Sequence, residues 1–275
     1  YCDESNETLL HITCENGDLD ATKYIISKGK IDIGHKDEDN NTIFHNACDS
    51  GNVELIKYLL SIYKFDINSP GKYGNYPLHL ARSISAVKYL TNLDNIDYNA
   101  KNNSNQTFLM HAVYLLREDI TSYLLSLNKF QVNAKDNNGN TILHYAAKWK
   151  NLYFIEKFAS SSDFDVFDTD INDMNILHYA CKGGRIDINI IHKMIFSYKI
   201  DYNSQDRNGN TCLHFLCNRY NSDSLLNVIK YFLSLKKIDI NVKNKDGKTP
   251  LHLACENDSF KVVRLFASLN NIDLN

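Results

Sequence analysis

The sequence lacks long runs of any one chemical character. Acidic and basic residues are mixed, with a net charge of −3 and no extended run of one sign. This argues against binding through phosphate neutralisation or to an anionic membrane surface. The longest apolar stretch, Phe108 to Leu116, contains His111 and is too short to span a bilayer. We therefore expect neither a nucleic-acid partner nor membrane insertion.

Motifs of the common catalytic families are also missing. The sequence contains no nucleophile elbow, Walker loop, kinase signature or His-Glu-x-x-His. Its acids are spread among short polar segments, where Asp and Asn act as turn formers. No signal peptide is visible. These absences predict a protein that is not an enzyme and has no cofactor and no metal site.

The seven cysteines form no Cys-x-x-Cys pair. Five of them share one slot of a repeated pattern that alanine fills elsewhere: Cys14, Cys48, Cys181, Cys217 and Cys255. A residue that alternates with alanine is expected to be a small core residue rather than a disulfide partner or a zinc ligand. Free buried thiols suit a reducing compartment, so we expect a cytoplasmic or nuclear protein.

What the sequence does contain is one stretch repeated throughout its length. Asp-Asn-Asn-Gly-Asn-Thr-Ile-Leu-His-Tyr-Ala-Ala, residues 136–147, returns in altered form at residues 206–215 and 244–254. Its histidine slot falls at eight positions, spaced by 34, 34, 31, 34, 34, 36 and 38 residues: His11, His45, His79, Met110, His144, His178, His214 and His252. Such a period predicts a chain of stacked structural repeats.

Each repeat reads as a turn followed by two helices. In the second repeat, Thr42 is expected to open a first helix and Gly51 to close it. The slot held elsewhere by Gly74, Gly139, Gly209 and Gly247 requires a positive φ angle, which asparagine also tolerates. Asparagine fills this slot at Asn6, Asn40 and Asn105, so the glycosylation sequons there are read as by-products of the turn.

Four repeats depart from the common length or pattern. The third is short between its helices, and Pro77 suits a first helical position. The fourth has Met110 in the histidine slot, so its His111 is a variable residue. The sixth and seventh carry extra residues near 187–189 and 221–223, as loops tolerate.

The hexapeptides Tyr76-Pro77-Leu78-His79-Leu80-Ala81 and Thr249-Pro250-Leu251-His252-Leu253-Ala254 resemble the signature of ankyrin repeats. The resemblance extends over essentially the whole chain. It implies a mostly α fold, an ankyrin-repeat α-solenoid with a helix-turn-helix and a β-hairpin in each repeat. The chain is then one ankyrin-repeat domain of eight repeats, at residues 3–36, 37–70, 71–101, 102–135, 136–169, 170–205, 206–243 and 244–275.

The resemblance also implies roles. In this family the slot histidine bonds the threonine of its own motif and the backbone of the adjoining loop, which makes it structural. Stacked repeats hold these histidines roughly 10 Å apart, too far for one zinc ion. The expected function is non-catalytic binding of a protein or extended peptide in a concave groove. Two alternatives are a targeting or regulatory arm of a larger enzyme or channel, and a catalytic activity within the repeats.

By the same resemblance, partner contacts come from the hairpin tips and from the first helix just after its alanine positions. The candidate contact residues in those slots are Tyr73, Arg82, Tyr114, Lys148, Trp149, Lys182 and Arg219. The first five would form a central patch that favours an acidic segment with an apolar anchor. The alternative for Tyr114 and Trp149 is packing onto neighbouring repeats.

Both ends of the chain are expected to be cut surfaces, because capping repeats normally carry a polar outer face. The last helix is apolar on more than one side, and the first repeat shows Leu9, Leu10 and Ile12. We expect further sequence, or a contact with another molecule, to cover the last helix.

Overall fold

The computed structural model of the chain describes residues 2–29, 31–149, 151–159, 161–183, 187–219 and 222–274. The chain divides into two compact units, Tyr1–Asn137 and Asn138–Asn275. In the first unit the helices are α1 Leu9–Glu15, α2 Leu19–Ser27, α3 Ile43–Ser50, α4 Val53–Ile62, the 3₁₀ helix η1 Lys72–Gly74, α5 Pro77–Leu80, α6 Ile84–Leu90, α7 Phe108–Tyr114 and α8 Glu118–Ser126. In the second unit they are α9 Ile142–Trp149, α10 Leu152–Ala159, α11 Ile176–Lys182, α12 Ile188–Phe196, α13 Cys212–Cys217, α14 Asp223–Leu233, α15 Pro250–Glu256 and α16 Phe260–Ala267.

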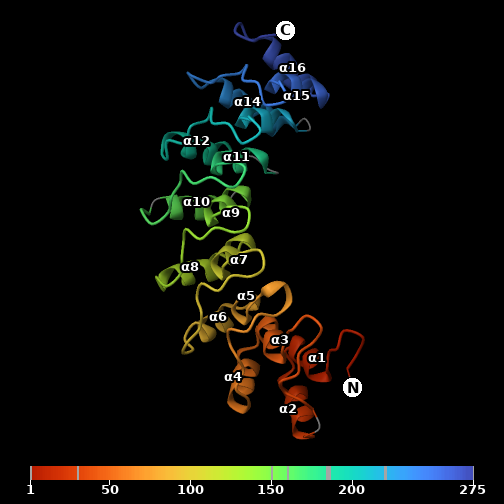
Figure 1. Cartoon of the computed structure of the whole chain (residues 1–275). Helices are drawn as coiled ribbons and strands as arrows, with labels where there is room; N and C mark the ends of the chain where they lie inside the picture. The colour runs from red at the N-terminus through yellow and green to blue at the C-terminus, as the bar shows by residue number, and fades with distance from the viewer. Residues whose placement is uncertain are drawn as a thin grey trace. The chain divides into compact units, whose positions relative to one another are not determined.

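The α-helices come in pairs, a first and a second helix in each repeat (Figure 1). Thr42 is the N-cap of α3, and Gly51 ends that helix in the left-handed conformation at φ 74°, as expected from the sequence. Asn52 then caps α4 with its side chain. Leu55, Ile56 and Leu59 on α4 are fully buried, which accounts for the apolar stripe of that helix.

The hairpins between helix pairs are turns rather than strands. Among the described residues the only β features are two isolated antiparallel bridges, Lys36 with Thr42 and Lys101 with Thr107. A buried Asp or Asn closes most turns by accepting backbone N–H groups, as Asp37 does from Asp39 and Asn41. The left-handed turn slot is as predicted: Asn6, Asn40 and Asn105 have φ of 59°, 63° and 61°, beside 77° at Gly139.

The second helices of the first unit are joined by cation–π contacts. The ammonium of one lysine lies over a tyrosine ring of the next second helix in three places: Lys23 over Tyr58, Lys57 over Tyr89 and Lys88 over Tyr123, at 5.3, 5.8 and 5.5 Å. These tyrosines are therefore engaged between repeats and are not offered freely on the outer surface.

The expected departures in length are visible in the helices. The first helix of the third repeat, α5, has four residues, and Pro77 occupies its start. The insertion expected at 187–189 forms the beginning of α12, where Asp187 is the N-cap. Of the other insertion, Asn221 lies outside the described residues, while Ser222 caps α14.

Several apolar side chains at the first and last helix pairs are not covered. Leu9 is 61 % exposed on α1, and Phe260 is 71 % exposed on α16, whereas Val262 and Phe266 on α16 are buried. Cys255 differs from the prediction of a core residue, because no helix pair packs against the far side of α15 among the described residues. Within the described ranges, no helix has both the length and the apolar character needed to cross a membrane.

Candidate functional site

The hairpin tips are joined to one another by a repeated backbone hydrogen bond. In the first unit the N–H of one tip donates to a carbonyl of the preceding tip at 3.2, 3.0 and 3.0 Å: Glu38 to Ser5, Asn103 to Tyr73 and Asn137 to Ser104. In the second unit the same bond measures 2.9, 2.7 and 2.9 Å: Ile171 to Asn138, Arg207 to Asn172 and Lys245 to Asn208. Side chains at the tips are thus presented from a fixed row within each unit.

The slot histidines join each hairpin to its helix. The backbone N–H of Thr42 donates to Nδ1 of His45 at 3.1 Å, which makes Nδ1 an acceptor and places the ring proton on Nε2. Nε2–H of His45 then donates to the carbonyl of Ser69 at 2.9 Å, in the next hairpin. The same two-sided arrangement occurs at His11, His144, His178 and His214. The structural role expected for these histidines is therefore confirmed.

Burial favours the neutral form of four of these histidines. It lowers the pKa values of His11, His45, His178 and His214, against a smaller opposite effect of the backbone carbonyls that they contact. Neutral imidazoles are poor general acids at pH 7, and their two nitrogens are already bonded. The row of histidines therefore supports the fold rather than a reaction.

The third and fourth repeats break the histidine pattern. His79 has Tyr76 where the other repeats have threonine or, in the sixth, asparagine, and its buried Nδ1 has no hydrogen-bond partner among the described residues. Burial lowers the pKa of His79 to about 4. Met110 is fully buried in the histidine slot of α7, while Nδ1 of the variable residue His111 contacts the carbonyl of His79 at 3.2 Å. The sequence analysis likewise placed Met110 in the histidine slot and His111 at a variable position.

Replacing His144 by alanine should lower the free energy of unfolding by about 1–2 kcal/mol, because bonds to Thr141 and Met174 are lost in a buried site. Urea unfolding of both proteins measures this change. Addition of a metal chelator should leave the melting temperature of the wild-type chain unchanged. A chelator-induced drop would instead identify the slot histidines as metal ligands.

The first unit contains a groove of about 300 Å³ between hairpin tips and first helices. Its lining includes two of the candidate contact residues, Tyr73 and Arg82. Tyr73 lies in η1 at the hairpin tip, where it is 71 % exposed and has a positive φ of 57°. Arg82 follows α5 and binds both carboxylate oxygens of Asp49 on α3, at 2.6 and 2.8 Å. We name this the acidic groove, lined by Glu7, Glu15, Asp37, Asp39, Asn41, His45, Asn46, Asp49, Lys72, Tyr73, Asn75, Leu80 and Arg82.

Tyr114, the third candidate of the first unit, is not among the residues that line the acidic groove. It ends α7, is 39 % exposed and stacks on His111 with ring centres 6.4 Å apart. Part of its ring thus packs within its own helix. This stacking lies within its own repeat, so it is not the packing onto a neighbouring repeat that the sequence left as the alternative.

In the second unit, Lys148 and Trp149 lie together at the end of α9. Trp149 is 44 % exposed, and the Lys148 ammonium lies over its ring at 5.9 Å. Lys182, at the end of α11, lies over the ring of Phe215 on α13 at 5.6 Å. Each pair places a cation beside an aromatic ring at the end of a first helix.

Arg219 has a different environment. Its guanidinium donates to the carbonyls of Cys181, at 3.2 Å, and Gly183, at the end of α11. Arg117 does the same in the first unit, donating to the carbonyl of Ala81 after α5 at 2.8 Å. Both arginines cap the C-terminus of a preceding first helix. Sequence reasoning missed Arg117, because its partner lies 36 residues away and no local motif marks the pair.

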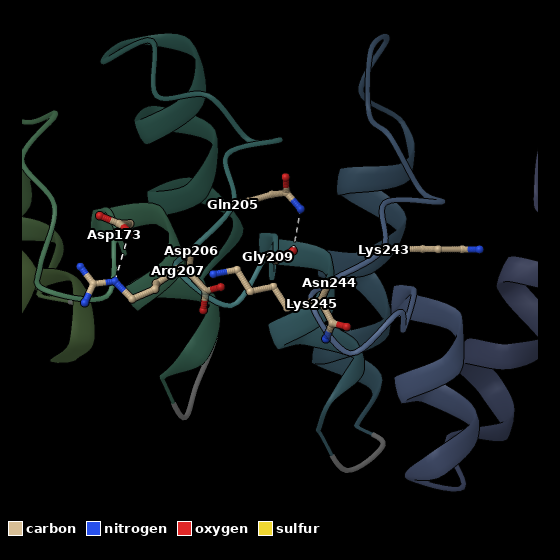
Figure 2. A pocket seen from close by; sticks show the side chains of 8 residues that line it. All are labelled: Asp173, Gln205, Asp206, Arg207, Gly209, Lys243, Asn244 and Lys245. Atoms are coloured by element: carbon tan, nitrogen blue, oxygen red, sulfur yellow. Dashed lines mark hydrogen bonds and ion pairs between the residues drawn. The ribbon is translucent and has the colours of Figure 1, made fainter.

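A second, more basic pocket lies at the hairpin tips of the second unit (Figure 2). Its volume is about 650 Å³, and its lining includes Arg207, Lys243 and Lys245. Nε of Arg207 is 3.4 Å from Asp173, and Figure 2 shows Lys243 extending away from that pair. These three basic residues are not among the seven candidate contact residues.

No metal-binding cluster is found in the part of the chain that the structure describes. It holds no group of three or more His, Cys, Asp or Glu side chains that could bind a metal ion. The seven cysteines are free, and burial raises the pKa of the Cys14 thiol to about 11. Such a thiol stays protonated and unreactive at neutral pH.

Comparison with known proteins agrees with this architecture. The family profile described as "Ankyrin repeats (3 copies)" matches the overlapping segments 10–102, 61–136, 83–170, 123–204 and 177–275. The crystal structure of the human ASB11 ankyrin repeat domain is similar at a TM-score of 0.62 and 20% identity, covering 75% of this chain and 90% of that one. No curated protein matches the sequence. Because the profile covers most of its length, the chain belongs to the ankyrin-repeat family.

Proposed function

We propose that the chain is a non-catalytic scaffold that binds a protein or an extended peptide with its hairpin tips and first helices. Ankyrin repeats generally mediate protein–protein interaction. The observation that carries the proposal for this chain is the hydrogen-bonded row of tips, beside which exposed aromatic and basic side chains are held. Tyr73 and Arg82 in the first unit and Lys148 and Trp149 in the second are the main examples.

The proposed binding domain consists of the eight repeats whose bounds the sequence predicts, residues 3–275. Its proposed contact residues are Tyr73, Arg82, Tyr114, Lys148, Trp149 and Lys182. Arg219 is included because its guanidinium binds carbonyls at the end of α11. Aromatic and arginine side chains contribute most of the binding energy in protein interfaces, which favours these positions. A reducing compartment, the cytoplasm or nucleus, is proposed because the thiols are free.

The test uses two aromatic residues of the same repeat. Trp149 and Tyr153 are 44 % and 46 % exposed, but Trp149 ends the first helix and Tyr153 lies on the second. A partner captured from cell extract by the intact chain should bind the Trp149→Ala variant more weakly by about 2 kcal/mol or more. The Tyr153→Ala variant should bind like the wild type.

Binding is measured by calorimetry, and melting curves of each variant check the fold. Equal losses for both variants, or a loss for Tyr153→Ala alone, would contradict the proposed binding face. If Trp149→Ala instead lowers the melting temperature and spares affinity, Trp149 is a packing residue.

A further inference from the structure

We propose that the acidic groove of the first unit binds an arginine-bearing basic segment of a partner protein. This inference rests on the proposed function and names the chemistry of the partner at one part of the binding face.

The charge of the groove lining is strongly negative. Five of the lining residues are acids and two are bases: Glu7, Glu15, Asp37, Asp39 and Asp49 against Lys72 and Arg82. The acids come from the first hairpin, the end of α1, the second hairpin and the end of α3. They therefore converge from separate elements, and a cation in the groove would interact with several of them at once.

Both bases of the groove are already paired. The Lys72 ammonium is 2.8 Å from the carboxylate of Asp39, and Arg82 binds Asp49 through two oxygens. Asp37 is buried and accepts N–H groups of its own turn. The pairing leaves two acids, Glu7 and Glu15, for which the described residues supply no cation.

The environment of Glu7 shows the effect of this excess. Its pKa is raised by burial and then by the negative charges of Asp3, Glu15, Asp37 and Asp39. The largest influences on this pKa all act in the same direction. A basic ligand would relieve this repulsion. The groove would therefore prefer positively charged ligands.

Two further groups of the groove suit a guanidinium. The Tyr73 ring is largely exposed, and aromatic faces bind cations; the in-chain Lys72 already lies 5.5 Å from the ring centre. The amide oxygen of Asn46 is a buried acceptor without a donor from the described residues. Arginine offers five N–H donors in one plane, and its fork matches carboxylates, as the Arg82–Asp49 pair shows within the groove.

This differs from the acidic ligand expected from the sequence. That expectation relied on Arg82 and Lys148 as open cations, and the structure pairs Arg82 with Asp49. In the groove that holds Tyr73 and Arg82, an acidic segment would meet unpaired carboxylates. A basic segment is the complementary one.

The experiment measures binding of the intact chain to labelled peptides by fluorescence anisotropy. The peptides share a glycine, serine and tyrosine framework and carry several arginines, several glutamines or several glutamates. One variant, Glu7→Gln with Glu15→Gln, removes the unpaired acids of the groove. The control variant, Asp20→Asn with Asp94→Asn, removes the same charge from exposed positions of the same unit outside the groove. Melting curves verify that both variants fold.

The arginine peptide should bind the wild-type chain, and the groove variant should weaken this binding roughly tenfold. The control variant should change it by less than about twofold. Higher salt should weaken binding further, because the charges are partly exposed.

Three results would overturn the inference: no binding of the arginine peptide, equal losses in the two variants, or preferred binding of the glutamate peptide. Its failure is separable from that of the proposed function. A partner that depends on Trp149 but binds the groove variant like the wild type would leave the scaffold proposal standing and remove the basic-ligand inference. Loss of dependence on Trp149 would count against the scaffold proposal, whatever the peptides show.

Discussion

Lowering the pH from about 7 to 5 should remove roughly 2 kcal/mol of unfolding free energy through His79 alone. Its pKa in the folded chain is lowered from 6.5 to about 4 by burial. The unfolded chain therefore takes up a proton below pH 6.5, while the folded chain stays neutral at this site. The stabilisation is fully present above pH 6.5 and is lost progressively as the pH falls toward 4. The other buried histidines have lowered pKa values and act in the same direction.

Urea unfolding at several pH values between 7.5 and 5 tests this, in a range where most carboxylates remain ionised. The His79→Gln variant is the control, because glutamine does not titrate. Its loss of stability between these pH values should be smaller than that of the wild type, whatever its absolute stability. Identical pH dependence in the two proteins would show that His79 does not carry the effect.

The Gly139→Ala substitution should destabilise the second unit by about 2–4 kcal/mol. Gly139 has a φ of 77°, which is strained for alanine, and an added Cβ would lie 2.9 Å from the backbone nitrogen of Ile171. That nitrogen donates to Asn138 in the row of hairpin tips. Relief of the clash must therefore separate two tips and weaken the bond between them.

Gly247 provides a matched comparison. Its φ of 73° is similar, but an added Cβ would meet no atom within 4 Å. Gly247→Ala should therefore lower the free energy of unfolding only by the cost of a positive φ for alanine, about 1 kcal/mol. Thermal and urea unfolding of the two variants separate the cost of the positive φ, which both share, from the cost of the Cβ contact, which only Gly139→Ala has. Equal losses would mean that the contact between neighbouring tips does not constrain position 139.

The repeated local features could be predicted from the sequence. The positive φ at Asn6 and Asn40, the cap at Thr42 and the helix end at Gly51 all depend on residues within a few positions of each other. Local sterics and hydrogen bonding determine such features, so the same residues produce the same local structure in each repeat. The family resemblance added the two-sided bonding of the histidines, which no spacing alone would give.

Features that depend on neighbouring repeats could not be predicted in the same way. Arg219 follows a first helix, as a contact residue would, but its guanidinium is used by carbonyls of the preceding repeat. Arg82 and Asp49 are 33 residues apart, and no local motif marks their pairing. Cys255 shares its slot with buried cysteines and is nevertheless exposed, because burial there requires a further helix pair. These outcomes are set by packing between repeats.

Hydrogen–deuterium exchange of the intact chain with and without a captured partner tests the binding face most directly. The proposal predicts slower exchange at the hairpin tips and first helices, including η1 with Tyr73 and the end of α9 with Trp149. The second helices α2, α4, α6 and α10 should exchange as in the free chain. Protection confined to the second helices would contradict the account.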